Sequence, residues 1–223
     1  MGVWRNVGPE RETISKNSRT RVFFKKKEKT RQLRYVFNTS VGAVVTLIYE
    51  FRDHAVIVSL DYDPDQVSVE SLPRFGMRMR VPAVYDSVKW SGRGPWENYP
   101  DRKNGAPFGR YSMPVTKYQV DYVYPQDNSN RTDCFDFTLN SDDHRLIVSS
   151  EEPFNFRMWD YSEEELEGAR HGYELMHHDY LNINIDKEII GVGGNDSWGA
   201  RTEPQYIPSA KEPYKLTFGI RLE

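Results

Sequence analysis

Strand-like runs of apolar residues recur along most of the chain, and many of them alternate strictly with polar residues. Successive side chains of a β-strand point to opposite faces, so this alternation is typical of strands with one face packed on a core. Polar and turn-forming residues separate the runs and indicate antiparallel connections. The pattern predicts an all-β fold, with strands near residues 22–24, 33–37, 44–51, 56–62, 75–81, 118–124, 135–139, 146–148, 154–158, 181–185 and 214–222.

One segment has helical rather than strand periodicity. Ser162 and Glu165 have the spacing of a capping box, in which each side chain bonds a backbone N–H group of the other residue. The spacing predicts one short helix that begins after Ser162 and packs an apolar stripe on the sheet. The stripe consists of Leu166, Ala169, Tyr173 and Met176.

Three arginines share one face of the predicted strand at residues 75–81. Arg74, Arg78 and Arg80 alternate with apolar residues, so a period of two places them together. Two interpretations stay open at this point. The face is either exposed to water or docked on the acidic surface of a partner.

The longest predicted irregular stretch, residues 90–102, combines two tryptophans and a tyrosine with prolines and glycines. Such a density of rings is typical of a packed loop with a fixed conformation. Glu97 and Asp101 have the residue types of a glycosidase acid pair. Several arginines lie nearby in the sequence, so we favour internal ion pairing over catalysis for these two carboxylates.

Glycines surround a polar triplet and one tryptophan in residues 191–199. They let the backbone turn tightly and leave Trp198 at the tip of a loop. A ring held in this way is a platform for the apolar face of a sugar or for an aromatic partner. Packing of Trp198 against the edge of the core is the other interpretation that the residues alone allow.

Composition narrows the range of partners. The 223 residues carry a formal net charge of -3 at pH 7, which gives no field that favours nucleic acid or an anionic membrane. No apolar run approaches the roughly 20 residues needed to cross a bilayer. Cys134 is the single cysteine, and its place in an alternating run indicates a structural role. We expect one domain over residues 1–223.

The clustered histidines do not have the spacing of a metal site. His177 and His178 are adjacent and do not share a helix face, and His171 has no histidine four residues further on. The acidic residues around Asp63 also lack the complete pattern of a calcium loop. We expect no metal ion in this chain, and general acid or base work by one of the histidines stays an alternative.

Three motifs occur in an order that one enzyme family shares. Trp90–Arg102 has the form G-R-G-P-x-E-N-Y-x-D-R, and residues 125–130 have the form P-Q-E-N-G-N, with Asp and Ser in place of Glu and Gly. Asp186 followed by residues 191–199 has the form D…G-x-G-G-D-D-S-W, with Asn195 in place of the first Asp of the pair. Together they resemble the C-terminal domain of glycoside hydrolase family 2 β-galactosidases.

The resemblance implies an antiparallel β super-sandwich of the galactose mutarotase type, with one short helix. It also implies that the two catalytic glutamates, and the magnesium (Mg) and sodium (Na) sites, lie on a preceding (β/α)8 barrel. No catalytic residue is therefore expected in this chain, which should be inactive in isolation. The implied role is substrate binding: Trp198 stacks on the sugar, while Asn195, Asp196 and Ser197 hold its loop.

The implied partners are a terminal β-D-galactoside such as lactose, the remaining domains of a parent β-galactosidase and further copies in a homo-oligomer. Two other functions stay open. An aldose 1-epimerase needs a histidine and a glutamate at the sugar ring, and His171, His177 and Glu174 offer those residue types. A stand-alone carbohydrate-binding or scaffolding domain is the non-enzymatic alternative.

Overall fold

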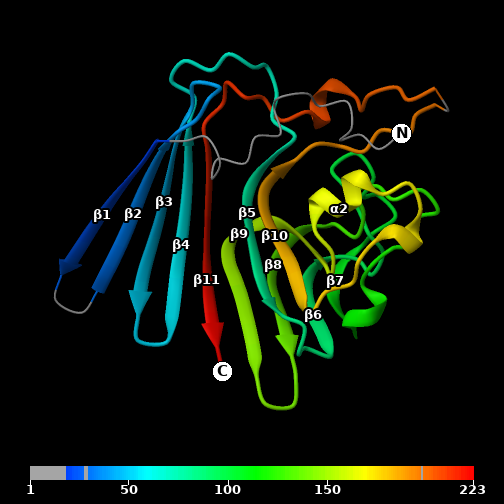
Figure 1. The fold of residues 1–223 in the computed structure, drawn as a ribbon, viewed down its shortest axis with the longest axis horizontal. Helices are drawn as coiled ribbons and strands as arrows, with labels where there is room; N and C mark the ends of the chain where they lie inside the picture. The colour runs from blue at the N-terminus through cyan, green and yellow to red at the C-terminus, as the bar shows by residue number, and fades with distance from the viewer. Residues whose placement is uncertain (1–18, 28–29, 197) are drawn as a thin grey trace.

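In the computed structural model, eleven strands pair into one sheet within the described residues, which are 19–27, 30–196 and 198–223, with side chains from residue 31 onward (Figure 1). Every pairing between the strands is antiparallel, as the alternation predicts. The strands are β1 (Arg19–Lys27), β2 (Thr30–Asn38), β3 (Val44–Arg52), β4 (Ala55–Asp63), β5 (Arg74–Pro82), β6 (Ser87–Arg93), β7 (Phe108–Pro114), β8 (Arg131–Asn140), β9 (Arg145–Trp159), β10 (Tyr180–Ile189) and β11 (Tyr214–Leu222).

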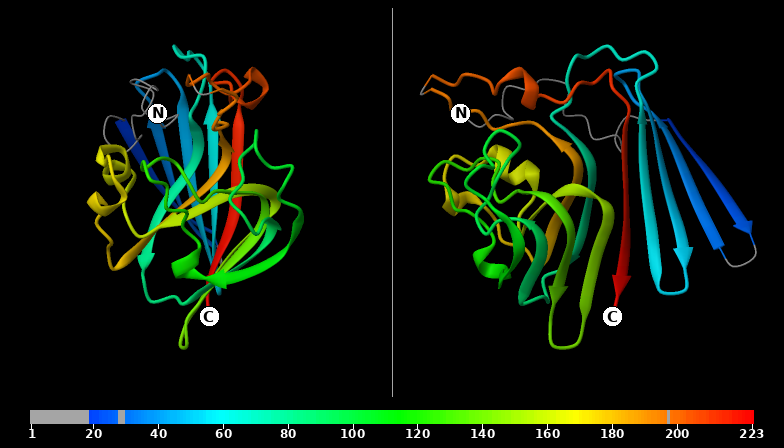
Figure 2. Two further views of the ribbon diagram at one scale, coloured as in Figure 1. Left: turned by 90° about the vertical axis from the view of Figure 1, so that its right-hand side faces the viewer. Right: turned by 180° about the vertical axis from the view of Figure 1, so that it is seen from behind.

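Strand β9 joins two parts of the sheet. Its first residues pair with β11, for example Val148 with Ile220, and its last residues pair with β10, for example Phe156 with Ile185. Beyond β11 the order continues through β4, β3 and β2 to β1, whereas β8, β6 and β7 follow on the other side of β9, and β5 pairs with β10. The strands β1 to β4 lie on one side of β11, and α2 with the loops around it lies on the other (Figures 1 and 2).

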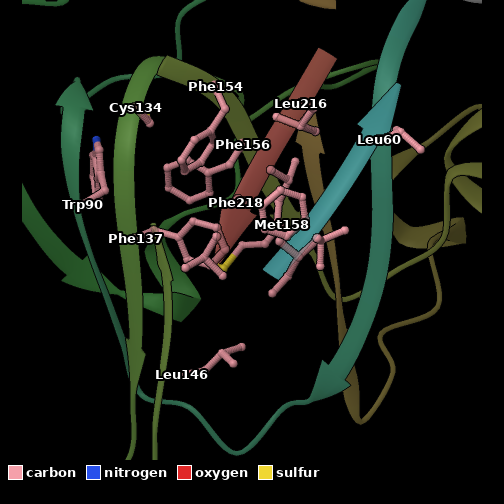
Figure 3. Close-up of a cluster of buried hydrophobic side chains, with 14 of the residues drawn as sticks. Leu60, Trp90, Cys134, Phe137, Leu146, Phe154, Phe156, Met158, Leu216 and Phe218 are labelled. Carbon is pink, nitrogen blue, oxygen red and sulfur yellow. The ribbon is translucent and has the colours of Figure 1, made fainter. Parts of the chain in front are cut away.

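Aromatic rings fill the core between the strands (Figure 3). Phe137 and Phe156 stack with ring centroids 4.7 Å apart, and both are buried, as is Phe218 on β11. Burial of one such ring stabilises the fold by about 1.5–3 kcal/mol, so the rings offset a modest apolar fraction. Cys134 is buried, as a structural cysteine should be, and a β-carbon on Gly92 would lie 2.4 Å from its sulfur.

The predicted helix begins where expected and ends early. α2 (Glu163–Gly168) has the complete capping box, because the Ser162 hydroxyl accepts from the backbone N–H of Glu165 and the Glu165 carboxylate accepts from that of Ser162. The backbone is extended at Ala169, so the stripe predicted beyond it is wrong, and Tyr173 is 83% exposed. Gly168 is a weak helix former at this point. Among the described residues, no helix has the length and apolar character to span a membrane.

One strand prediction and one loop boundary between residues 87 and 124 are wrong. Residues 118–124 form no strand, because Tyr118 follows a 3-10 helix, η3 (Val115–Lys117), and the backbone N–H of Val120 bonds a side chain instead of a neighbouring strand. Conversely, the loop predicted from Trp90 onward begins later, since β6 extends to Arg93 and pairs with β7, which the apolar pattern did not reveal.

Two of the three arginines on the β5 face are ion-paired within the chain. Arg74 forms ion pairs with Asp186 on β10 and with Glu163 at the start of α2. Arg78 reaches the carboxylates of Glu163 and Glu164 at 3.3 and 3.4 Å. Arg80 is exposed, so the interpretation of a face open to water holds at that end, whereas the acidic groups that meet Arg74 and Arg78 belong to β10 and to α2 of the same chain, not to a partner.

Candidate functional site

Trp198 is presented to solvent by a tight turn. The carboxylate of Asp196 accepts hydrogen bonds from the backbone N–H groups of Trp198 (2.8 Å) and Ala200 (3.1 Å). Hydrogen bonds from the backbone of Ala200 and Trp198 hold the pKa of Asp196 below its ordinary value. The Trp198 side chain is 94% exposed, so the interpretation of this ring as a cap on the core edge is wrong.

Asn195 and Ser197 were also predicted to support this loop, and the structure describes only the first of them. The side-chain amide of Asn195 donates a hydrogen bond to the carboxylate of Glu203 at 3.2 Å. An aspartate, which the family motif has at this place, carries no N–H group to donate, so this contact is a consequence of the replacement. Ser197 lies outside the described residues.

Asp101 fixes the base of the same loop. Its carboxylate accepts hydrogen bonds from the backbone N–H groups of Val192 (3.0 Å) and Gly193 (2.7 Å) and from the hydroxyl of Thr202 (2.7 Å). The first and third sequence motifs are thereby joined through one side chain. Asp101 was noticed in the sequence only as half of an acid pair, because its backbone partners lie about ninety residues away.

Glu97 has a structural role as well. Its carboxylate accepts from the guanidinium of Arg102 (2.6 Å), from the backbone N–H of Ser129 (2.7 Å) and from the hydroxyl of Tyr122. The predicted internal ion pairing is confirmed for this residue. The carboxylate oxygens of Glu97 and Asp101 accept hydrogen bonds from other groups of the chain. Neither carboxylate is therefore arranged as an acid or a nucleophile toward a substrate.

The second motif packs against the first. The backbone N–H of Asn98 donates to the carbonyl of Asn130 (2.8 Å), and the Asn130 amide donates back to the carbonyl of Asn98 (2.9 Å). The Tyr99 hydroxyl donates to the carboxylate of Asp127 at 2.6 Å. The loop after β6 is therefore a fixed body, as its ring content predicted.

Ser129 has a left-handed backbone where the family motif has glycine. Its φ angle is 67°, a conformation that disfavours residues with a β-carbon. The Ser129 hydroxyl accepts a hydrogen bond from the backbone N–H of Val120 at 2.9 Å. The side chain therefore contributes an interaction that glycine lacks, and this offsets part of the backbone cost.

A buried network of charges lies beneath these loops. Asp186, the first residue of the third motif, is fully buried and accepts from Arg74. Arg157 is buried too, and it donates to Asp127 and to Glu163. Burial opposes ionisation of Glu163, but the guanidinium groups around it outweigh that effect and hold the pKa of this carboxyl well below its ordinary value. The network anchors the motifs to β5, β9 and β10.

A second exposed tryptophan was missed by the sequence analysis. The Trp96 side chain is 70% exposed at an open depression of about 480 Å³. Asp101, Arg102 and Asn104 also line this depression. The signal in the sequence was the first motif itself, whose variable position Trp96 occupies.

Each of the three clustered histidines pairs with a carboxylate. His171 pairs with Glu174 (3.2 Å), His177 with Asp160 (2.9 Å) and His178 with Glu165 (2.9 Å). The first two rings are largely exposed, and the segment that carries them is outside the sheet, contrary to what an epimerase site requires. Within the described part of the chain, no three His, Cys, Asp or Glu side chains gather to hold a metal ion.

Comparisons with known proteins agree with the motifs. Residues 1–220 match the protein family described as beta galactosidase small chain. The β-galactosidase of Pseudoalteromonas haloplanktis is 36% identical over 186 residues, which are 82% of this chain and 17% of that protein. The β-galactosidase of Alteromonas mediterranea is 33% identical over 192 residues, with coverages of 82% and 18%. The chain spans less than a fifth of the length of these relatives.

The fold also has a counterpart among solved structures. A protein described as an aldose 1-epimerase from Escherichia coli K12 superposes with a TM-score of 0.50 at 10% identity, covering 92% of this chain and 68% of that one. At this level of identity the likeness concerns the fold alone. The predicted antiparallel super-sandwich of the galactose mutarotase type is confirmed.

Proposed function

Because the chain belongs to the β-galactosidase small-chain family, we propose that it is the C-terminal part of an enzyme that hydrolyses terminal β-D-galactosides such as lactose. The nucleophile and the general acid/base are two glutamates on a (β/α)8 barrel in another part of that enzyme. Support comes from Glu97 and Asp101, the acid pair considered in the sequence, because structural donors engage both carboxylates. Hydrolysis then proceeds by double displacement with retention at the barrel carboxylates.

The contribution of this part is a carbohydrate-stacking wall. One observation carries the proposal: the Trp198 ring is 94% exposed on a turn that Asp196 closes and Asp101 anchors. An indole ring offers a flat apolar surface to the C–H face of a sugar, and one aromatic stack stabilises binding by about 0.5–1.5 kcal/mol beyond area burial. Trp198 therefore orients and holds the galactoside, and no proton moves to or from this chain.

The metal ions of the parent enzyme belong to the barrel in this proposal. Structural donors already occupy the carboxylates of Asp101, Glu97 and Asp186, and the described residues offer no cluster of three ligands. Magnesium and sodium are therefore assigned to other domains, which are also the partners that this chain meets.

Steady-state kinetics test both the proposed role of Trp198 and the assignment of catalysis to another part of the enzyme. The isolated chain should not hydrolyse nitrophenyl β-D-galactoside, while the parent enzyme assembled with this chain should. In the assembled enzyme, Trp198→Ala should raise KM about threefold to tenfold with a smaller change in kcat, because the stack is made in ground state and transition state alike. Tyr173→Ala removes another exposed ring and should leave both constants unchanged. Turnover by the pure chain, or an unaltered KM in Trp198→Ala, would contradict the proposal.

A further inference from the structure

Trp96 is an exposed ring on a fixed backbone. The side-chain amide of Asn98 donates to the carbonyl of Trp96 at 2.9 Å, and the next residue, Glu97, is held by Arg102 and by the backbone of Ser129. The ring itself is 70% exposed, so the fixed segment presents apolar surface to solvent instead of burying it. A platform that is already ordered loses little conformational entropy when a ligand covers it.

The polar groups beside Trp96 suit a neutral, hydroxyl-rich ligand. Arg102 and Asn104 line the same depression of about 480 Å³ and are exposed. The Arg102 guanidinium donates to Glu97 through Nη2, and a guanidinium carries further N–H donors besides that one. The Asn104 amide offers both a donor and an acceptor. A flat ring with a few polar groups around it matches the apolar face and the hydroxyl rim of a sugar.

Charge does not favour an anion at this place. The Lys103 ammonium is bound to the carboxylate of Asp133 at 3.0 Å, and the Arg102 guanidinium is neutralised by Glu97 at 2.6 Å. Asp101 adds a further carboxylate to the lining. The depression therefore holds as many acidic as basic groups, which fits an uncharged saccharide better than a phosphate or an acidic peptide.

The depression and the Trp198 loop are mechanically joined. Asp101 lines the depression and binds the backbone N–H groups of Val192 and Gly193, where the Trp198 loop begins. Trp198 is five residues from Gly193, so the two Cα atoms lie at most about 18 Å apart. Two exposed indoles thus stand on two loops that are held by one carboxylate.

We propose that the Trp96 depression is a second carbohydrate subsite, which binds a further sugar unit of a neutral oligosaccharide whose first unit stacks on Trp198. The proposal rests on the function assigned to Trp198 and names the substrate class that the same surface prefers. Oligosaccharides longer than a disaccharide gain contacts at Trp96, whereas a monosaccharide occupies Trp198 alone.

Ligand-observed NMR titrations of the 223-residue chain test the subsite. The probes are galactose and a linear β-1,4-linked galactotetraose. The tetraose should bind wild type about threefold to tenfold more tightly than galactose does. Trp96→Ala should abolish that gain and leave galactose affinity unchanged, and Asn104→Ala should reduce the gain. Trp198→Ala should weaken both ligands, and Tyr173→Ala, which removes an exposed ring elsewhere, should weaken neither.

The outcomes separate this inference from the function on which it rests. If Trp198→Ala weakens galactose binding but the tetraose binds equally to wild type and Trp96→Ala, the second subsite is wrong and the role of Trp198 stands. If Trp198→Ala leaves galactose binding unchanged, the role of Trp198 itself is wrong. Absence of tetraose binding by wild type contradicts the second subsite, and the role of Trp198 is then decided by KM in the assembled enzyme.

Discussion

Asp101 packs its carboxylate against the backbone of Gly191 so closely that a β-carbon on Gly191 would lie 2.5 Å from the carboxylate carbon. This contact lets the carboxylate reach the N–H groups of the two residues that follow. The absence of a side chain at Gly191 is therefore a condition for anchoring the Trp198 loop. Several measurable consequences depend on this relationship and on the network below it.

Gly191→Ala should displace Asp101 and destabilise the chain. The new methyl group would also lie 2.5 Å from the Thr202 hydroxyl, so an overpacking cost of about 1–3 kcal/mol in the free energy of unfolding is expected. Gly168→Ala is the matched control, because a β-carbon there meets no atom within 4 Å. Urea unfolding of both variants measures the difference, and equal stabilities would show that the contact is not confining.

Asp101→Asn should loosen the Trp198 loop without unfolding the chain. An amide has one acceptor oxygen in place of two, so one of the backbone N–H groups of Val192 and Gly193 loses its partner. Hydrogen exchange at these two amides should become about tenfold faster. Asp142→Asn, an exposed change in the turn between β8 and β9, serves as the control. Unchanged exchange at both amides would show that Asp101 does not anchor the loop.

Substitutions at Ser129 should separate backbone strain from hydrogen bonding. Ser129→Ala keeps a β-carbon at φ 67° and removes the acceptor of the Val120 N–H group, so a loss of about 1–2 kcal/mol in stability is expected. Ser129→Gly loses the same bond but relieves a left-handed conformation that costs about 1 kcal/mol. It should therefore stay within about 1 kcal/mol of wild type. A glycine variant less stable than the alanine variant would contradict this account.

Glu163→Gln should destabilise the fold far more than Glu164→Gln. Glu163 accepts from Arg74, Arg157 and the Asn184 amide, and removing its charge leaves buried guanidinium groups short of a counter-charge. The expected loss is about 3–5 kcal/mol, as for other broken buried pairs. Glu164 is mostly exposed and meets only Arg78 at 3.4 Å, so its variant should lose less than about 1 kcal/mol. Denaturant unfolding at neutral pH compares the two, and similar losses would argue against the network.

The contribution of Glu163 should also depend on pH. The pKa of Glu163 is lowered in the folded state from its ordinary value of 4.5, so the stabilisation is complete above that pH and is lost as the pH falls toward the lower folded pKa. The difference between wild type and Glu163→Gln should therefore shrink below pH 4.5, by up to about 1.4 kcal/mol per pH unit. Unfolding measured at several pH values checks the slope. A difference that stays constant under acid conditions would contradict the lowered pKa.

Alternation predicted the sheet because strand contacts follow the two-residue period that the sequence displays. It failed at residues 118–124, where Tyr118 is a buried core residue but the segment has no neighbouring strand to pair with. Helical periodicity failed beyond Ala169, because α2 ends at Gly168, Tyr173 lies in a separate 3-10 helix, η4 (Gly172–Glu174), and Met176 lies in no helix. In both places the sequence has the pattern of a regular element. Whether that element forms depends on partners that are distant in the sequence.

Local chemistry predicted more of the Trp198 loop than of its supports. Glycines and a short polar triplet suffice to indicate a turn with an exposed ring, because those effects act over a few residues. The clamp by Asp101 depends on chain crossings about ninety residues apart. The partner of Arg74 on α2 is equally remote, so a charged strand face gave no sign of what covers it.

The pairing of early strands with late ones sets an order of events during synthesis. β4 pairs with β11, and β5 pairs with β10. Neither early strand therefore has all of its backbone hydrogen bonds until about the last forty residues of this chain have left the ribosome. The edges of β4 and β5 remain open to other chains during that interval. A ribosome that pauses before β10 would thus expose the growing chain to misassembly, with the Trp198 loop not yet made.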